Sequence, residues 1–131
     1  MIEYISILLM ILAGMFNSSM DVLKHKWSIS IFKDWNNQNW IDPTISWHTK
    51  WNIDQKLFGK QVWLVDKLMS TVLVWVTDMW HFVKMLMLVC ISFAIIFYSP
   101  IYSILVDAII FYFAFTGTFE LFYSKIFVKK S

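Results

Sequence analysis

Two long apolar runs constrain this sequence more than any other feature. Residues 79–98 and 101–122 are almost entirely apolar, and only Ser99 and Pro100 separate them. A helix needs about 20 apolar residues to cross the roughly 30 Å hydrocarbon core of a bilayer, and each run is that long. Proline disfavours helix at the residue before it, so we expect a tight turn at this dipeptide. The sequence therefore predicts a helical hairpin over residues 79–122 that crosses a membrane twice.

A third apolar stretch, residues 1–24, completes the predicted membrane domain. It is apolar from Ile5 to Phe16 and more polar from Asn17 to Asp21, which makes it the weakest of the three spans. No basic segment precedes it, so we expect a retained helix. The composition agrees, because 59% hydrophobic and 15% charged residues in 131 exceed the apolar content that a soluble domain of this size can bury. The predicted fold class is an all-α membrane protein with three transmembrane helices in a single domain.

The lysines predict the orientation. With three spans, every lysine outside the spans lies either between the first two spans or on the basic tail, residues 124–131, which puts them all on one side. The positive-inside rule makes that side cytoplasmic, so we expect a protein of the cell (inner) membrane with its N-terminus outside and its C-terminus inside. An alternative with a fourth span over residues 62–77 moves the tail to the other side. The lack of arginine argues against a nucleic acid partner.

Between the first two spans the sequence is rich in tryptophan, since all eight Trp residues lie at positions 27–80. Tryptophan favours the headgroup layer, so residues 25–60 are predicted to form an interfacial Trp-rich loop, either as a collar or as an ordered lid over a site. From Gln61 polar residues recur at helical spacing. They predict one long helix over residues 61–98, amphipathic at first and then transmembrane. A break near Thr77 is the alternative, because Thr and Asp are good helix caps.

Two Asp/His pairs are the strongest candidates for a functional site. Asp21 and His25 are four residues apart at the end of the first span, and Asp78 and His81 are three apart at the start of the second. Both spacings place the two side chains on one helix face. With three spans both pairs lie at the cytoplasmic interface, where together they could bind a divalent transition metal such as zinc, manganese or iron, or a lipid headgroup. The alternative is that these residues are solvated or cap helices.

Other polar residues surround these pairs or lie within a span. The supporting residues are Asn17, Trp47, His48, Lys50, Trp80 and Lys84. In "SWHTKW", aromatic rings and a lysine near an imidazole suit an anionic headgroup, although a plain interfacial anchor is the alternative. Asp107 lies inside the third span, so we expect it to face other helices, either for packing or as a proton relay or oligomer contact. Glu120 is placed to pair with Lys84 across the hairpin.

Four segments carry a resemblance to a known group of proteins. They are "FNSSMD", "ISWHTKW", "TDMWHF" and "GTFELFYSKIF", which together sample most of the chain. The sequence resembles a family of short integral membrane proteins encoded by bacteria and phages. This resemblance implies that six residues are the positions of interest: Asp21, Trp47, Lys50, Asp78, Trp80 and His81. It implies nothing about a reaction, and no nucleotide-binding, zinc-protease or serine-hydrolase motif is present.

Two classes of function fit the sequence. In the first, the Asp/His residues form a metal or headgroup site at the membrane interface, with the Trp-rich segment above it, and the site is either catalytic or purely for binding. In the second, the protein is a non-enzymatic oligomer, such as a holin-like pore protein, or a small subunit of a larger membrane complex. The Trp and His pattern is more detailed than a pore requires and favours the first class. The sequence patterns fit both an enzyme and a protein without catalytic activity.

Overall fold

Three long helices form the body of the protein. The computed structural model describes residues 4–46, 64, 67–68 and 71–129. Its long helices are α1 (Ile5–His25), α5 (Met79–Ile96) and α6 (Ile104–Leu121), and a π-helical segment, η5 (Phe122–Ile126), continues α6. All three are long and apolar enough to cross a membrane. Among the described residues the nearest approach to β structure is one isolated bridge between Ser30 and Val128. The predicted all-α fold with three membrane-spanning helices is therefore confirmed by length and composition.

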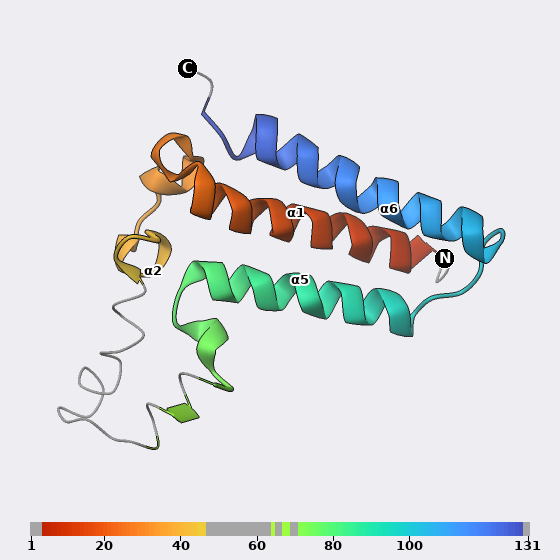
Figure 1. The fold of residues 1–131 in the computed structure, drawn as a ribbon, viewed down its shortest axis with the longest axis horizontal. Coiled ribbons are helices and arrows are strands. Elements are labelled where there is room, and N and C mark those ends of the chain that lie inside the picture. Colours follow the sequence, from red (N-terminus) through yellow and green to blue (C-terminus); the bar gives the residue numbers. More distant parts are fainter. Residues whose placement is uncertain (1–3, 47–63, 65–66, 69–70, 130–131) are drawn as a thin grey trace.

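The N-terminal helix lies in the middle of the bundle. α1 packs against both α5 and α6 and lies between them (Figure 1). In the spanning segments, 39% of α1 is buried, against 22% of α5 and 6% of α6, so α1 is the most buried of the three long helices. α5 and α6 run in opposite directions and are joined by residues 97–103, as a hairpin requires. The sequence did not indicate that a third helix would lie between the two arms.

Small side chains explain why the least apolar span takes the central position. Ser6, Ala13, Gly14 and Ser18 of α1 are all buried. A Cβ atom on Gly14 would lie 2.3 Å from the backbone oxygen of Phe115, so α1 and α6 touch through their backbones at this point. Lipid tails are as apolar as leucine, and helices in membranes therefore associate through close packing of small residues. The polarity that weakens α1 as a predicted span is what allows it to be the core helix.

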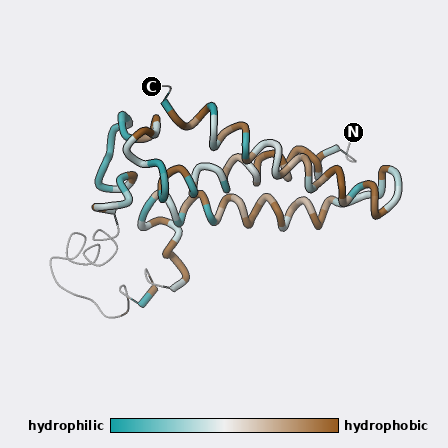
Figure 2. The backbone as a smooth tube through the Cα atoms, turned by 45° about the horizontal axis from the view of Figure 1, so that its top comes forward, coloured by the Kyte–Doolittle hydropathy of each residue, from teal (hydrophilic) through white to brown (hydrophobic). Residues whose placement is uncertain are grey.

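The chain closes over one end of the bundle with short helices. They are η2 (Trp27–Ile29), η3 (Ile31–Asp34), α2 (Gln38–Ile41) and η4 (Val74–Val76). The C-terminal segment is attached there, because Ile31 N–H donates to the Phe127 carbonyl at 3.0 Å and Lys129 N–H donates to the Ile29 carbonyl at 2.8 Å. The C-terminus and α2 lie at this end, and the N-terminus lies at the other (Figure 1). Hydrophilic residues gather at the end that holds α2 (Figure 2).

The second spanning helix is shorter than predicted. Residues 71–78 form turns and the short helix η4, and α5 begins only at Met79. Asp78 has an extended backbone and its carboxylate accepts the His81 N–H at 2.9 Å, so it caps α5. The prediction of one continuous helix over residues 61–98 is wrong for this part of the chain, and the alternative break near Thr77 is what the structure has. The described residues of 62–77 likewise form no helix long enough for a fourth span.

Candidate functional site

Asp78 and His81 form a close pair at the start of α5. His81 Nδ1 lies 2.7 Å from Asp78 Oδ2, and the Thr77 hydroxyl lies 3.2 Å from the same oxygen. The other oxygen of Asp78 accepts the backbone N–H of His81. Asp78 is only 4% exposed, whereas 29% of the His81 side chain is exposed. A buried carboxylate that accepts the backbone N–H and lies against the ring of His81 thus holds an imidazole that is partly open to its surroundings.

The pairing decides which nitrogen of His81 is available. A carboxylate can only accept hydrogen bonds, so we assign the proton between the two groups to Nδ1. In a neutral imidazole the other nitrogen, Nε2, is then a proton acceptor. The Trp80 ring packs edge-on against the His81 ring at a centroid distance of 5.0 Å and further restricts its position. His81 is therefore a fixed imidazole with a basic nitrogen directed away from Asp78.

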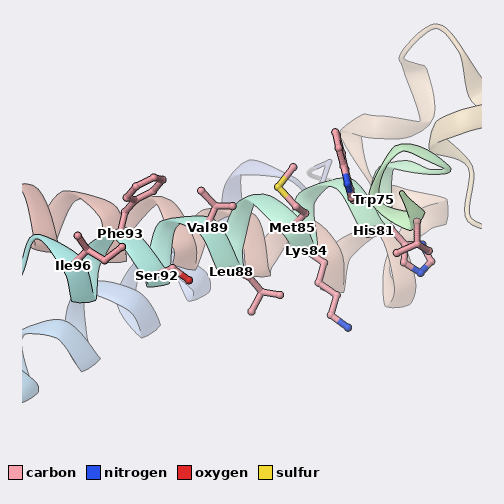
Figure 3. Close-up of a pocket in the computed structure, with 10 residues that line it drawn as sticks. Trp75, His81, Lys84, Met85, Leu88, Val89, Ser92, Phe93 and Ile96 are labelled. Atoms are coloured by element: carbon pink, nitrogen blue, oxygen red, sulfur yellow. The ribbon is translucent and has the colours of Figure 1, made fainter. Parts of the chain in front are cut away.

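A long groove runs from His81 along the outer face of α5. This α5 groove has a volume of about 510 Å³. It is lined by Val74, Trp75, His81, Lys84, Met85, Leu88, Val89, Ser92, Phe93 and Ile96. His81 and Lys84 lie at one end, and Phe93 and Ile96 lie at the other (Figure 3). The groove is therefore almost wholly apolar along its length and basic at the end near the α5 N-terminus.

A second hollow shares one lining residue, His81, with the first, and we call the surroundings of His81 the junction of the two hollows. This end pocket has a volume of about 470 Å³ and lies between the end of α1, the segment after α2 and the start of α5. Its lining residues are Lys24, Trp27, Pro43, Thr44, Ser46, Asp78, Trp80 and His81. Two hydroxyl groups, one lysine and the Asp78–His81 pair make it more polar than the α5 groove. His81 is shared by both hollows, so a molecule with an apolar tail and a polar head could occupy both at once.

Two lysines flank this junction. Lys84 Nζ lies 5.1 Å from the centroid of the Trp80 ring, one helical turn beyond His81, and its side chain is exposed. Lys24 is exposed at the end of α1, where it lines the end pocket. Cation–π contact favours the position of Lys84 over the Trp80 ring without neutralising its charge. Each of the two hollows that share His81 is thus lined by one lysine, and the end pocket is also lined by the Asp78 carboxylate.

The structure does not combine the two predicted Asp/His pairs into a metal site. Asp21 is half-buried and His25 is exposed, and both lie on α1. Among the described residues, no three or more His, Cys, Asp or Glu side chains form a group that could hold a metal ion. Asn17 is half-buried on α1 and lines neither the α5 groove nor the end pocket. Of the four predicted site residues, the geometry thus brings together Asp78 and His81.

Other predicted site residues have separate outcomes. Trp80 and Lys84 lie beside the Asp78–His81 pair, as expected from their positions on one helix. The supporting residues of the "SWHTKW" segment, Trp47, His48 and Lys50, lie outside the described residues. Sequence reasoning missed five contributors to the end pocket: Lys24, Trp27, Pro43, Thr44 and Ser46. Nothing in their local patterns could have indicated them, because they come from two segments, residues 24–27 and 43–46, that only the fold brings together with the start of α5.

Asp107 has a structural role at the opposite end of the molecule. α6 begins at Ile104, so Asp107 lies in its first turn. Its carboxylate accepts the Tyr98 hydroxyl at 3.0 Å and the backbone N–H groups of Ile101 at 3.0 Å and Tyr102 at 3.2 Å. Loss of hydration raises the pKa of the Tyr98 hydroxyl. The hydrogen bond from this hydroxyl to Asp107 and the negative charge of Asp107 raise it further. Asp107 therefore closes the 97–103 loop on itself, which explains how a carboxylate can be 2% exposed at the edge of a span.

The predicted ion pair between Glu120 and Lys84 is not what the structure shows. Glu120 accepts a hydrogen bond from Ser124 on its own helix, and Lys84 lies over Trp80. The reason is the position of α1, which lies between α5 and α6.

In comparisons with protein-family models, with curated proteins and with solved structures, nothing matches this chain. The function must therefore be argued from the site itself.

Proposed function

We propose that this protein binds an anionic acyl lipid of the membrane in which it lies. The headgroup would occupy the junction of the two hollows, near His81, Lys84 and Lys24, and one acyl chain would follow the α5 groove. The observation that carries this proposal is that His81 lines both the apolar groove and the more polar end pocket. The two hollows together have the amphipathic character of a lipid.

The length of the groove suits an acyl chain. It reaches from His81 to Ile96, and the fifteen steps of helix between these two residues extend about 22 Å at roughly 1.5 Å per residue. The hydrocarbon of one leaflet is about half of the roughly 30 Å core, so the groove is long enough for one chain. Its outer residues, such as Leu88 and Phe93, are exposed and apolar, as contact with lipid requires. An acyl chain can therefore follow α5 with its polar end beside His81.

The charges at the junction favour an anionic headgroup. Lys24 and Lys84 lie on different helices, and each lines one of the hollows that meet at His81. A basic residue near a membrane surface contributes about 1 kcal/mol of attraction to anionic lipids. A transition metal is less well supported, because the two Asp/His pairs do not converge on the three or four ligands that such ions usually take. The site thus suits a phosphate headgroup better than a metal ion.

The same proposal includes an orientation. The end of the bundle that holds α2, the lysines of residues 24–33 and the C-terminal segment faces the cytoplasm, where the positive-inside rule places basic residues. The N-terminus and the 97–103 loop lie on the outer side of the cell membrane. The alternative of an oligomer-forming pore or small subunit has less support. The exposed large residues of α6, such as Ile109 and Phe113, are apolar, and lipid can cover them as well as another subunit can.

The lipid proposal is tested by measuring which lipids stay bound to the purified protein. Native mass spectrometry would compare phosphatidylglycerol with phosphatidylcholine of identical acyl chains. We expect the anionic lipid to bind more tightly, and Lys84→Gln to weaken its binding about fivefold, the equivalent of about 1 kcal/mol. Lys33→Gln is the matched control, because Lys33 is an exposed lysine that lines neither hollow.

The groove is tested separately by filling it. Ser92 lines the α5 groove, so Ser92→Phe should reduce the binding of both lipids. Ile95→Phe is its control, since Ile95 is 72% exposed on the same helix and lies outside this groove. Equal binding of the two lipids, unchanged by Lys84→Gln and by Ser92→Phe, would contradict the proposal.

A further inference from the structure

We propose that the Asp78–His81 pair hydrolyses an acyl ester of the bound lipid, with His81 as general base and Asp78 as its positioning residue. This inference rests on the proposed lipid-binding function and adds a reaction to it. Its basis is the geometry of the pair and its place between the two hollows.

Asp78 does more than cap a helix. Capping requires one side-chain oxygen, and Asp78 Oδ1 supplies it by accepting the backbone N–H of His81. Its second oxygen, Oδ2, accepts from Nδ1 of the His81 ring at 2.7 Å. The ring is thus held in one orientation and one tautomer by a carboxylate that is almost wholly buried. This arrangement keeps Nε2 of His81 free to accept a proton from a reacting molecule.

The bound lipid would place its ester next to this nitrogen. In an acyl lipid the ester joins the apolar chain to the polar headgroup. His81 lies where the apolar groove meets the end pocket, so the ester of a lipid that fills both lies beside His81. Lys84 lines the groove at the same end (Figure 3). The ammonium of Lys84 is therefore available to the oxygen on which negative charge develops.

The reaction needs only water as its second reactant. His81 Nε2 removes a proton from a water molecule as the water oxygen forms a bond to the ester carbonyl carbon. The electron pair of the carbonyl moves to its oxygen, where the charge of Lys84 stabilises it. The carbonyl then reforms, the bond to the alcohol oxygen breaks, and that oxygen takes the proton back from His81. The products are a fatty acid and a lysolipid, and Asp78 stabilises the imidazolium between the two proton transfers.

The test uses the full-length protein in mixed micelles of detergent and phosphatidylglycerol, in water enriched in ¹⁸O. Mass spectrometry measures the release of fatty acid and its content of ¹⁸O. We expect the wild type to release labelled fatty acid, and His81→Gln to lower the rate by about 100-fold or more. His25→Gln is the matched control, since His25 is an exposed histidine on α1 that lines neither hollow. It should leave the rate unchanged.

Asp78→Asn separates the positioning role from the capping role. Asparagine is an equally good cap, so the fold and the retention of phosphatidylglycerol should be kept. The amide no longer fixes the tautomer of His81, so kcat should fall by about 100-fold or more while KM changes less than twofold. Circular dichroism and lipid retention verify that the variant is folded. An unchanged kcat in folded Asp78→Asn would show that Asp78 only caps the helix.

The outcomes also distinguish the two proposals. If the wild type retains phosphatidylglycerol but releases no labelled fatty acid above protein-free micelles, hydrolysis is wrong and lipid binding stands. If the wild type neither retains the lipid nor releases fatty acid, both proposals are wrong. Release of fatty acid that His81→Gln does not reduce would also overturn the role of His81.

Discussion

α1 and α6 are both long and apolar enough to span a membrane and run in the same direction, yet they are held in opposite ways. In the spanning segments, 39% of α1 is buried and 6% of α6. The buried part of α1 is largely small residues, and two of them, Ser6 and Ser18, have hydroxyls with no hydrogen-bond partner among the described residues. These serines therefore contribute by being small. In lipid, a helix enters the core because its neighbours can approach it closely, and high hydrophobicity is not required.

α6 instead packs along α1 with little of its own surface buried, and it is also attached at its two ends. The only buried residue of the helix is Asp107, which closes the 97–103 loop. At the other end, the Phe127 carbonyl and the Lys129 backbone N–H bond to the segment after α1, and Lys129 forms an ion pair with Asp34 at 2.5 Å. Between these ends, the approach of Phe115 to Gly14 joins α6 to α1. The exposed residues of α6, such as Tyr112 and Phe113, are free to contact lipid.

The largest expected effect is in cysteine labelling, which tests whether α1 and α6 run in the same direction. A cysteine on one side of the membrane reacts with an impermeant reagent and a cysteine on the other side does not. After Cys90→Ala removes the native thiol, cysteines replacing Asn36 and Ser131 report the chain beyond α1 and beyond α6. Both should be protected from an impermeant thiol reagent in intact cells, and a cysteine replacing Ser99 should react. Protection at one of the two positions with labelling at the other would mean that α1 and α6 do not run in the same direction, and the comparison would fail.

The contact at Gly14 should be the most sensitive point of the core. Gly14→Ala places a Cβ atom against the Phe115 backbone, so the two helices must separate. We expect a loss of about 2–3 kcal/mol in the free energy of unfolding, as for overpacked cores, measured by thermal unfolding in detergent. Gly117→Ala is the control, because a Cβ at Gly117 meets nothing within 4 Å. It should be neutral or stabilise the protein by up to about 1 kcal/mol. Equal effects of the two substitutions would show that α1 is not tightly packed against α6.

The end attachment of α6 should give a smaller effect. Asp107→Ala removes the acceptor of three hydrogen bonds in the 97–103 loop. We expect a loss of about 1–2 kcal/mol, because water near the membrane surface replaces part of what is lost. Asp107→Asn keeps one acceptor oxygen and should lose less. Thermal unfolding in detergent measures both variants. If Asp107→Ala lowers the free energy of unfolding more than Gly14→Ala does, the position of α6 depends mainly on the 97–103 loop.

Features that lie within one segment were predictable. The thickness of the bilayer and the rise of a helix act on each apolar run separately, so the three spans follow from residues 5–25, 79–96 and 104–126 alone. The Asp78–His81 pair was also accessible, because a spacing of three residues puts two side chains on one face of a single turn. The cap at Asp78 could be foreseen only as an alternative. Whether residues 71–78 continue the helix depends on contacts such as the hydrogen bond from Trp40 Nε1 to the Val76 carbonyl.

The sequence by itself determined that three helices are long and apolar enough to cross a membrane, and that Asp78 and His81 lie together on one turn. Only the tertiary structure decided that α1 lies between α5 and α6. It also decided that, among the described residues, Asp21 and His25 do not form a metal-binding group with Asp78 and His81. Lys24 and Ser46 line one pocket with His81 for the same reason, since only the fold brings their segments together. The physical reason is that helices in lipid choose their neighbours by the fit of their surfaces. That fit depends on the surfaces of two helices together, so the sequence pattern of either helix alone does not predict it.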